Sequence, residues 1–219
     1  MKNIRAFTLV EVLVTLGLIG VVAAVTLPNL IKNYQKHVTV NKLKKNYTVI
    51  QQVLKRAEAD FQTDISELDD MWVNDTEGIL KTYFIPYLQG AKLYRQMCNH
   101  KYGDYIHLNG RSVSNPPFNN VSSIQLNNGV CIGISSSVEG TDRSLFIDID
   151  GNHPPNIAGK DFFIFVIGPN NKLTVGNLEN PNSGWGACSL SESRSAGWYC
   201  ASKIIKDGWK ISDDYPWLW

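Results

Sequence analysis

The N-terminal segment of this chain contains an unbroken apolar run, and this run restricts the possible folds more than any other feature. In the 21 residues from Phe7 to Leu27, Glu11 is the only ionisable side chain. A helix of that length reaches roughly 30 Å, which is the thickness of the hydrocarbon core of a bilayer. The segment is therefore long enough to cross a membrane once.

Basic residues before this run indicate its orientation. Lys2 and Arg5 precede it, and no acidic residue lies between them. Lysine and arginine beside a membrane span tend to stay in the cytoplasm. We therefore predict that the N-terminus is cytoplasmic and that residues 29–219 lie on the other side of the membrane.

The composition is that of a folded protein and excludes several classes of function. The 219 residues are 43% hydrophobic, and 21 basic against 20 acidic residues give a net charge of +1. This balance argues against a strongly basic nucleic-acid binder, so no nucleic-acid partner is required. The sequence contains no G-x-S-x-G, G-x-x-x-x-G-K-[ST] or H-E-x-x-H motif, which predicts a protein that is not an enzyme.

Four cysteines lie in the part predicted to be extracytoplasmic: Cys98, Cys131, Cys188 and Cys200. An even number of cysteines in an oxidising compartment predicts disulfides. No C-x-x-C pair is present and the histidines are scattered, so a zinc site has little support. Of the three possible pairings we favour Cys98 with Cys131 and Cys188 with Cys200, because the second bridge then closes a short loop.

An ordinary secretory signal peptide is the first alternative for the N-terminus. The basic start, the apolar run and Val22-Ala23-Ala24 fit a cleavable signal with a mature start near Val25. However, the apolar core of a signal is typically about 7 to 15 residues and uncharged, whereas this run contains Glu11 and continues to Leu27. A carboxylate there costs on the order of 2 to 3 kcal/mol, so such a group usually has a function or a partner.

The start of the apolar run carries a specific family resemblance. After a short basic leader, Phe7-Thr8-Leu9-Val10-Glu11-Val12-Leu13 resembles the processing and methylation signal of type IV pilins and of the pseudopilins of type II secretion. The resemblance implies that a prepilin peptidase cuts between Ala6 and Phe7 and that the new amine of Phe7 is methylated. Ala6 stands where the family usually has Gly.

The same resemblance assigns subunit assembly to Glu11, Gly20 and Pro28. Gly20 and Pro28 fall where the family commonly has residues that loosen the helix in the assembled filament. Cleavage before Phe7 places the new amine one helical turn from Glu11, on the same face. In the family's filaments the carboxylate is taken to meet the amine of a neighbouring subunit, which pairs two costly charges. The alternative is that Glu11 merely extends towards the cytoplasmic headgroups.

The helical pattern continues beyond Pro28. Apolar or aromatic residues recur in steps of three and four, as on one stripe of an amphipathic helix; they are Val40, Leu43, Tyr47, Ile50, Leu54, Ala57 and Phe61. We expect this stripe to pack on the sheet of its own domain. The predicted organisation is a leader at 1–6, a transmembrane and assembly helix at 7–28, an amphipathic continuation at 29–61 and a head at 62–219.

Charge is segregated along this helix and the segment after it. Seven lysines or arginines and no acid lie between Lys32 and Arg56, and eight acids and no base lie between Glu58 and Glu77. Such blocks are usually solvated faces. The alternative is that staggered neighbouring subunits set the basic segment of one against the acidic segment of another, which makes assembly salt-sensitive.

The remaining sequence predicts an α+β head. Residues 62–78 are predicted to form a polar loop and residues 79–88 a short amphipathic helix, capped by Asn74 or Asp75 and bent at Pro86. Period-two patterns separated by Asn-Gly and Pro-Asn turns predict strands at 105–109, 121–126, 130–134, 145–149, 162–167 and 172–175, and a short helix is expected within 197–206. The predicted fold class is therefore pilin-like, a long N-terminal helix packed on an antiparallel sheet.

One loop of the head carries alternating oxygen donors. Asp148, Asp150, Asn152 and Asp161 lie around Gly151, and calcium needs about six to eight oxygen ligands. Some pseudopilins carry a calcium-binding loop in the head, so calcium is the one cofactor that the resemblance suggests. The full calcium-loop spacing and its terminal Glu are missing, and an Asx turn between two strands explains the same residues without a metal.

Five of the six tryptophans lie in the last 35 residues: Trp185, Trp198, Trp209, Trp217 and Trp219. Exposed tryptophans can bind sugars or a protein partner, whereas buried ones close the core. We expect burial, because Trp is mostly interior and the head has few other large apolar side chains.

These features favour a structural subunit of a type IV pilus or of a type II secretion pseudopilus, inserted once in the inner membrane with its head in the periplasm or at the cell surface. The resemblance implies several partners: other pilin copies, a prepilin peptidase, an inner-membrane assembly platform with its ATPase, and membrane lipid. The competing class is a membrane-tethered binding module, such as a minor pilin or adhesin that recognises a surface, a glycan or DNA. A continuous exposed aromatic or basic patch favours that class.

Overall fold

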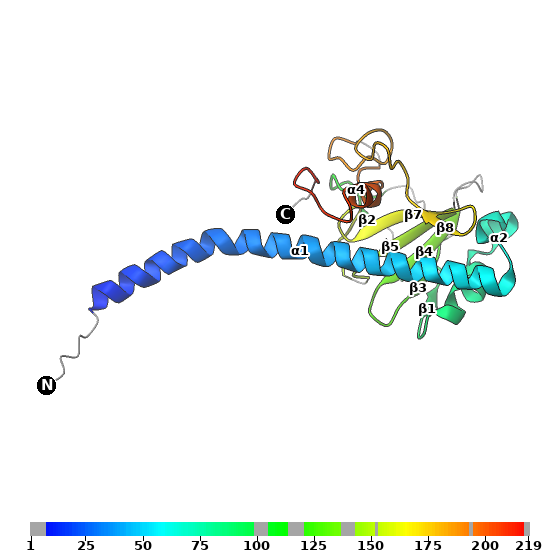
Figure 1. Cartoon of the computed structure of the whole chain (residues 1–219), viewed down its shortest axis with the longest axis horizontal. Helices are drawn as coiled ribbons and strands as arrows, with labels where there is room; N and C mark the ends of the chain where they lie inside the picture. The colour runs from blue at the N-terminus through cyan, green and yellow to red at the C-terminus, as the bar shows by residue number, and fades with distance from the viewer. Residues whose placement is uncertain are drawn as a thin grey trace. The chain divides into compact units, whose positions relative to one another are not determined.

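Helix α1 (Leu9–Phe61) runs through both of the compact units into which the chain divides, residues 1–38 and residues 39–219. The computed structural model describes residues 8–98, 105–113, 121–136, 143–151, 153–192 and 195–216. The described residues of the first unit belong to the N-terminal part of α1 and to Thr8, whereas the second unit contains the rest of α1 and the head (Figure 1).

The centre of the head is a six-stranded sheet in which all neighbouring strands are antiparallel, with the order β1-β3-β4-β5-β7-β8. Its strands are β1 (Lys92–Tyr94), β3 (Ser122–Gln125), β4 (Cys131–Ser136), β5 (Arg143–Asp148), β7 (Phe162–Gly168) and β8 (Lys172–Thr174). Two short strands, β2 (Tyr105–Ile106) and β6 (Asn156–Ile157), pair in parallel as a separate sheet. The predicted α+β class with a long helix and an antiparallel sheet is confirmed.

The sheet is buried on both faces. Alternate side chains of each strand point to opposite sides, so each strand contributes residues to both faces. Ile132 lies opposite Ile147 and Ile134 opposite Leu145, and all four belong to the core that also contains the buried residues of α1. Phe146, between two of them on β5, belongs instead to a second core on the other face. Long apolar runs such as those of β4 and β5 are typical of strands covered on both sides.

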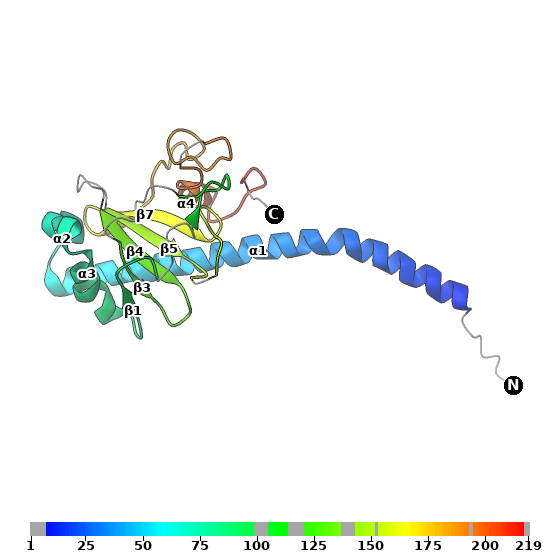
Figure 2. The same cartoon turned by 180° about the vertical axis from the view of Figure 1, so that it is seen from behind.

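The head part of α1 covers one face of the sheet, as both views show (Figures 1 and 2). The ring of Tyr47 lies 5.7 Å from that of Phe165, measured between centroids. The side chain of Gln51 donates to the carbonyl of Asn171 at 2.9 Å and accepts from the N–H of Leu173 at 2.8 Å. The helix is thus joined to β8 and its turn by polar bonds as well as by apolar packing.

The predicted apolar stripe of α1 accounts for most of this contact. Val40, Leu43, Ile50, Leu54 and Ala57 are buried, and Tyr47 is half-buried. The prediction is wrong for Phe61, which is 45% exposed. Phe61 is the last residue of the helix and contacts only the edge of the Tyr83 ring among the described aromatic pairs.

Residues 62–78 do not form the polar loop predicted from their composition. They contain three short helices, η1 (Ile65–Glu67), α2 (Asp69–Asn74) and α3 (Thr76–Ile79). Ile65 and Trp72 are fully buried, and the indole N–H of Trp72 donates to the carbonyl of Ile65 at 2.7 Å. Asp64 and Asp75 accept backbone N–H bonds in the first turns of η1 and α3. These acids are helix caps, and each helix is too short to show a periodic pattern.

The helix predicted at 79–88 begins earlier and changes type along its length. After α3, the chain continues as a π-helical turn, η2 (Leu80–Phe84), and a 3-10 turn, η3 (Ile85–Tyr87), that contains Pro86. Asp75, rather than Asn74, is the cap, through the N–H of Gly78. The last helix, α4 (Cys200–Lys206), lies within the range expected for it.

Candidate functional site

The N-terminal part of α1 exposes its apolar side chains to solvent. From Leu9 to Ile31, every large apolar side chain is at least 43% exposed. By length and composition the helix can cross a membrane. Burial of each large side chain is worth about 1.5 to 3 kcal/mol, so a surface of this size drives association with lipid or with other helices.

Helix α1 begins with a reciprocal pair of hydrogen bonds between Thr8 and Glu11. The backbone N–H and the hydroxyl of Thr8 both donate to Oε2 of Glu11, each at 2.9 Å. The N–H of Glu11 donates in turn to the hydroxyl of Thr8 at 3.2 Å. This is the capping box of the type Thr-x-x-Glu, which satisfies N–H groups that a helix start leaves without partners.

The capping box gives Glu11 a role within its own chain that the sequence analysis did not identify. Its signal, Thr8 followed three residues later by Glu11 at the start of an apolar run, is present in the sequence. The carboxylate therefore already has hydrogen-bond donors before any neighbour arrives. Ala6 and Phe7, the residues of the predicted cleavage and methylation, lie outside the described residues.

The other two predicted assembly residues lie in the exposed part of α1. Pro28 is inside the helix, which continues through it without a break. A side chain added at Gly20 meets nothing within 4 Å, so packing within the described chain does not require glycine there. Glycine on an exposed apolar helix allows another helix to approach closely.

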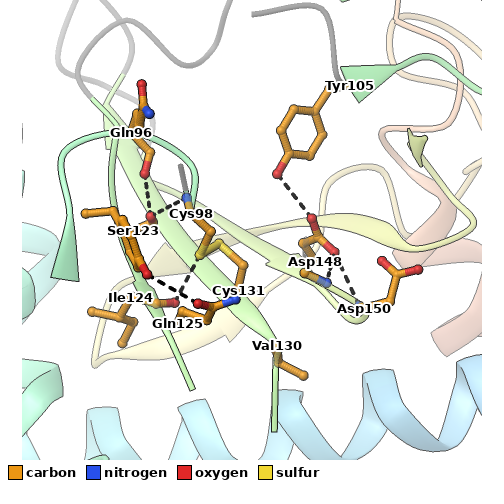
Figure 3. The surroundings of a disulfide bond; sticks show 12 residues. Gln96, Cys98, Tyr105, Ser123, Ile124, Gln125, Val130, Cys131, Asp148 and Asp150 are labelled. Carbon is orange, nitrogen blue, oxygen red and sulfur yellow. Dashed lines mark hydrogen bonds between the residues drawn. A yellow bond between two sulfur atoms is a disulfide. The ribbon is translucent and has the colours of Figure 1, made fainter. Parts of the chain in front are cut away.

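The four cysteines form Cys98–Cys131 and Cys188–Cys200, the pairs that the sequence analysis favours. The first bridge joins the segment after β1 to β4, on the sheet face turned away from α1 (Figure 3). There the N–H of Cys98 donates to the hydroxyl of Ser123 at 2.8 Å. The second bridge closes a loop of sequence separation 12 at the start of α4.

Calcium binding stays a prediction, because only three of the four predicted ligands lie among the described residues. Asp148 is fully buried at the end of β5; its Oδ1 accepts the N–H of Gly151 at 2.8 Å and its Oδ2 accepts the hydroxyl of Tyr105 at 3.1 Å (Figure 3). The buried Asp161 accepts the N–H of Ile157. No group of three or more His, Cys, Asp or Glu in the described parts of the chain is arranged to hold a metal ion. Asn152, the fourth predicted ligand, lies outside them.

Burial changes the protonation of these carboxyl groups. It raises the pKa of Asp148 well above its ordinary value, and the hydrogen bond and charge of the nearby Asp150 act in the same direction. Burial, together with the charge of Asp150, raises the pKa of Asp161 to about 8. Asp161 is therefore mainly protonated at neutral pH, and burial disfavours the charged form of Asp148 as well.

The tryptophans of the C-terminal segment are not uniformly buried. Trp185 is 57% exposed, which contradicts the expected burial, and Trp198 and Trp209 are half-buried. Trp217 and Trp219 lie outside the described residues. The ring of Trp185 contacts that of Trp198 edge to face, with 4.9 Å between centroids. The core is closed by the sheet and by Trp72 instead, so the head does not need Trp185 inside.

Two family models match the chain, and one ends close to where the other begins. The model described as "Prokaryotic N-terminal methylation motif" matches residues 1–27. The model described as "Family of unknown function (DUF6613)" matches residues 29–218. No curated protein and no solved structure matches the chain.

Proposed function

Since the chain belongs to the family of unknown function DUF6613 and begins with the methylation motif of type IV pilins and pseudopilins, we propose that it is a structural subunit of a type IV pilus or a type II secretion pseudopilus. The motif supports processing by prepilin peptidase and assembly with other pilin subunits. The single observation that carries the proposal is the exposed apolar surface of α1 from Leu9 to Ile31, most of which lies within the matched motif.

Each part of the N-terminus has a task in this proposal. Prepilin peptidase cuts between Ala6 and Phe7, and the amine of Phe7 is methylated. The freed helix then leaves the membrane with other copies, driven by an inner-membrane platform and its ATPase. Glu11 contributes its charge to the contact with the Phe7 amine of a neighbour while Thr8 keeps its carboxylate hydrogen-bonded. The protein catalyses no reaction; it is part of a filament.

The disulfides support a head outside the cytoplasm. Disulfides persist in oxidising compartments such as the periplasm and are rare in the cytosol. Charge alone is less decisive, because Lys32, Lys36 and Lys42 also lie close enough to the apolar run, within about 15 residues of its end, to influence orientation. The two bridges of the head therefore carry the argument for orientation, and α1 is consistent with a single-pass anchor in the inner membrane.

Mass spectrometry of the mature N-terminus tests the proposal. Protein isolated from cells that express a prepilin peptidase is expected to start at Phe7 and to carry the mass of one added methyl group. The same protein from cells without the peptidase is expected to retain residues 1–6. A mature start near Val25 in both preparations would show an ordinary signal peptide and remove the proposal.

The exposed ring of Trp185 favours one second candidate function, a membrane-tethered module that binds a surface. Trp185 lies on a loop held by the Cys188–Cys200 bridge, and its exposed ring contacts Trp198 and Tyr199. A rigid, exposed tryptophan is a common anchor in binding surfaces. A Trp185→Ala variant that assembles normally but no longer adheres to the parent's target surface would support this candidate.

A further inference from the structure

Basic side chains line one side of the head part of α1. Lys42, Lys45 and Arg56 are exposed, and they are spaced by three and eleven residues, or about one and three helical turns. They therefore lie on the same side of the helix, away from buried residues such as Leu43 and Leu54. We call these three residues the basic row.

In the described part of the chain, the two lysines of the basic row are not neutralised by an ion pair, whereas Arg56 lies one helical turn before Asp60. Lys55 pairs with Glu58 at 2.6 Å, and Lys44 lies over the ring of Trp209, but neither belongs to the row. Among the described residues, no carboxylate lies within ion-pair distance of Lys42 or Lys45. Three exposed cations with no acid between Glu11 and Glu58 in the sequence make this side of the helix strongly positive.

Acidic side chains follow at the end of the same helix. Asp60 lies in the last turn of α1, Glu67 in η1 and Asp70 in α2, and all three are exposed. Asp60 accepts a hydrogen bond from the Tyr87 hydroxyl at 2.6 Å and Asp70 accepts one from the Asn74 amide at 2.8 Å. These donors are neutral, so they orient the carboxylates and leave their charge. We call Asp60, Glu67 and Asp70 the acidic end.

The positions of the two charged groups define a stagger between copies. Two copies packed in register would set one basic row beside another, and like charges in contact cost several kcal/mol. Lys45 and Asp60 are fifteen residues apart, which is roughly 22 Å at the helical rise. A copy displaced by that distance along α1 sets the basic row of one chain beside the acidic end of the next.

We propose that the basic row of one copy docks on the acidic end of a second copy of this chain, displaced by roughly 20 to 25 Å along the helix. The inference rests on the proposed filament function and specifies one lateral contact within it. The occupant is a second copy because both halves of the contact belong to one chain whose net charge is +1. Single exposed ion pairs are worth about 0.2 to 1 kcal/mol, so this contact sets the register of subunits rather than their total affinity.

Isotope-resolved cross-linking tests the contact directly. Filaments are assembled from an equal mixture of unlabelled and nitrogen-15-labelled processed chains and treated with a carbodiimide that joins lysine to carboxylate without a spacer. The proposal predicts mixed-label peptides that join Lys42 or Lys45 to Asp60, Glu67 or Asp70. Filaments that give cross-links only within single-label chains would overturn it.

Charge reversal provides a second test. The double variant Lys42→Glu/Lys45→Glu and the double variant Glu67→Lys/Asp70→Lys should each lower filament yield about tenfold or more, and their combination should restore it. The matched control Lys92→Glu/Lys172→Glu makes the same charge change on two exposed lysines of the sheet edges and should assemble like the parent. High salt should weaken the parent contact, since the Debye length falls to about 3 Å at 1 M.

The outcomes separate this inference from the proposed function. Normal assembly of both double variants, without cross-links between copies, overturns the basic-row contact and leaves the filament function standing. Failure of the unsubstituted, processed chain to form filaments removes the filament function and this contact with it.

Discussion

The two parts of α1 differ in how far their apolar side chains are buried, although they belong to one continuous helix. From Thr39 to Phe61 the helix buries a stripe against its own sheet, and its core residues Leu43, Ile50 and Leu54 are fully inaccessible. From Leu9 to Ile31 the large apolar side chains are all exposed. The difference shows that the head part of α1 is covered by its own sheet, whereas the apolar side chains from Leu9 to Ile31 are not covered by the described residues.

Replacing Glu11 should have the largest effect on the exposed part of the helix and none on the head. Glu11→Leu should leave membrane insertion and the melting temperature of the head unchanged but reduce filaments to background, because it removes the charge in the apolar surface. Filament yield by sedimentation and microscopy is the measurement. Glu11→Gln is the matched control, since Gln still closes a capping box with Thr8 but carries no charge. Normal filaments from Glu11→Gln would assign Glu11 to helix capping alone.

A pair of leucine truncations compares the two parts of the helix directly. Leu54→Ala should lower the free energy of unfolding of the head by about 2 to 5 kcal/mol, because Leu54 is fully buried. Leu16→Ala removes the same atoms from a side chain that is 61% exposed and should leave head unfolding unchanged. Chemical denaturation in detergent, followed by the head's tryptophan fluorescence, measures both. Equal losses would contradict the difference in burial between the two leucines.

The disulfides should stabilise the head against unfolding and have no effect on the exposed apolar segment of α1. Chain-entropy arguments predict that replacing Cys98 and Cys131 with Ser costs about 4 kcal/mol, since the bridge closes a sequence separation of 33. Replacing Cys188 and Cys200 should cost about 3 kcal/mol for a separation of 12. Denaturant midpoints check the order, and a larger loss for the shorter loop would contradict it.

The buried carboxyl groups predict how the stability of the head depends on pH. The folded pKa of Asp161 is raised to about 8, so its contribution is fully present below its unfolded pKa near 4 and is lost as the pH rises through 8. Asp161→Asn should therefore flatten the fall in stability between pH 5 and 8, by about 1 to 3 kcal/mol.

Asp214 is a control of opposite sign for this pH dependence. Hydrogen bonds from Lys203 and Ser212 lower the pKa of Asp214 to about 2, so its contribution is lost as the pH falls from about 4 through 2. Asp214→Asn should therefore lower stability above about pH 4, make no difference below about pH 2, and flatten the acidic side of the pH profile. A rise in melting temperature when calcium is added at pH 8 would instead indicate that a cation binds the carboxylates around Asp148.

Local patterns made much of the fold predictable. The apolar run, the stripe of α1 and the strands beside Asn-Gly turns depend on neighbours in sequence; the turn at Asn127 to Gly129, for example, is closed by the N–H of Leu126 donating to the carbonyl of Val130 at 2.9 Å. The capping box is also predictable from Thr8 and Glu11, whereas the family resemblance assigns Glu11 to subunit assembly.

The missed features depend on distant contacts. Strands β1 and β6 are two or three residues long and exist because β3 and β2 pair with them. The short helices after α1 are fixed by the burial of Trp72 and by an ion pair between Arg143 on β5 and Asp69 in α2. The exposure of Trp185 follows from a core already filled by other residues, which no local pattern reports.

An image reconstruction of the assembled filament tests the central claim most directly. The account predicts that the apolar side chains from Leu9 to Ile31 are buried between helices of different copies, that Glu11 lies beside the amine of a neighbour's first residue, and that the sheets of the heads face outwards. A filament held together by its heads, with this helical segment still exposed or absent, would contradict the account.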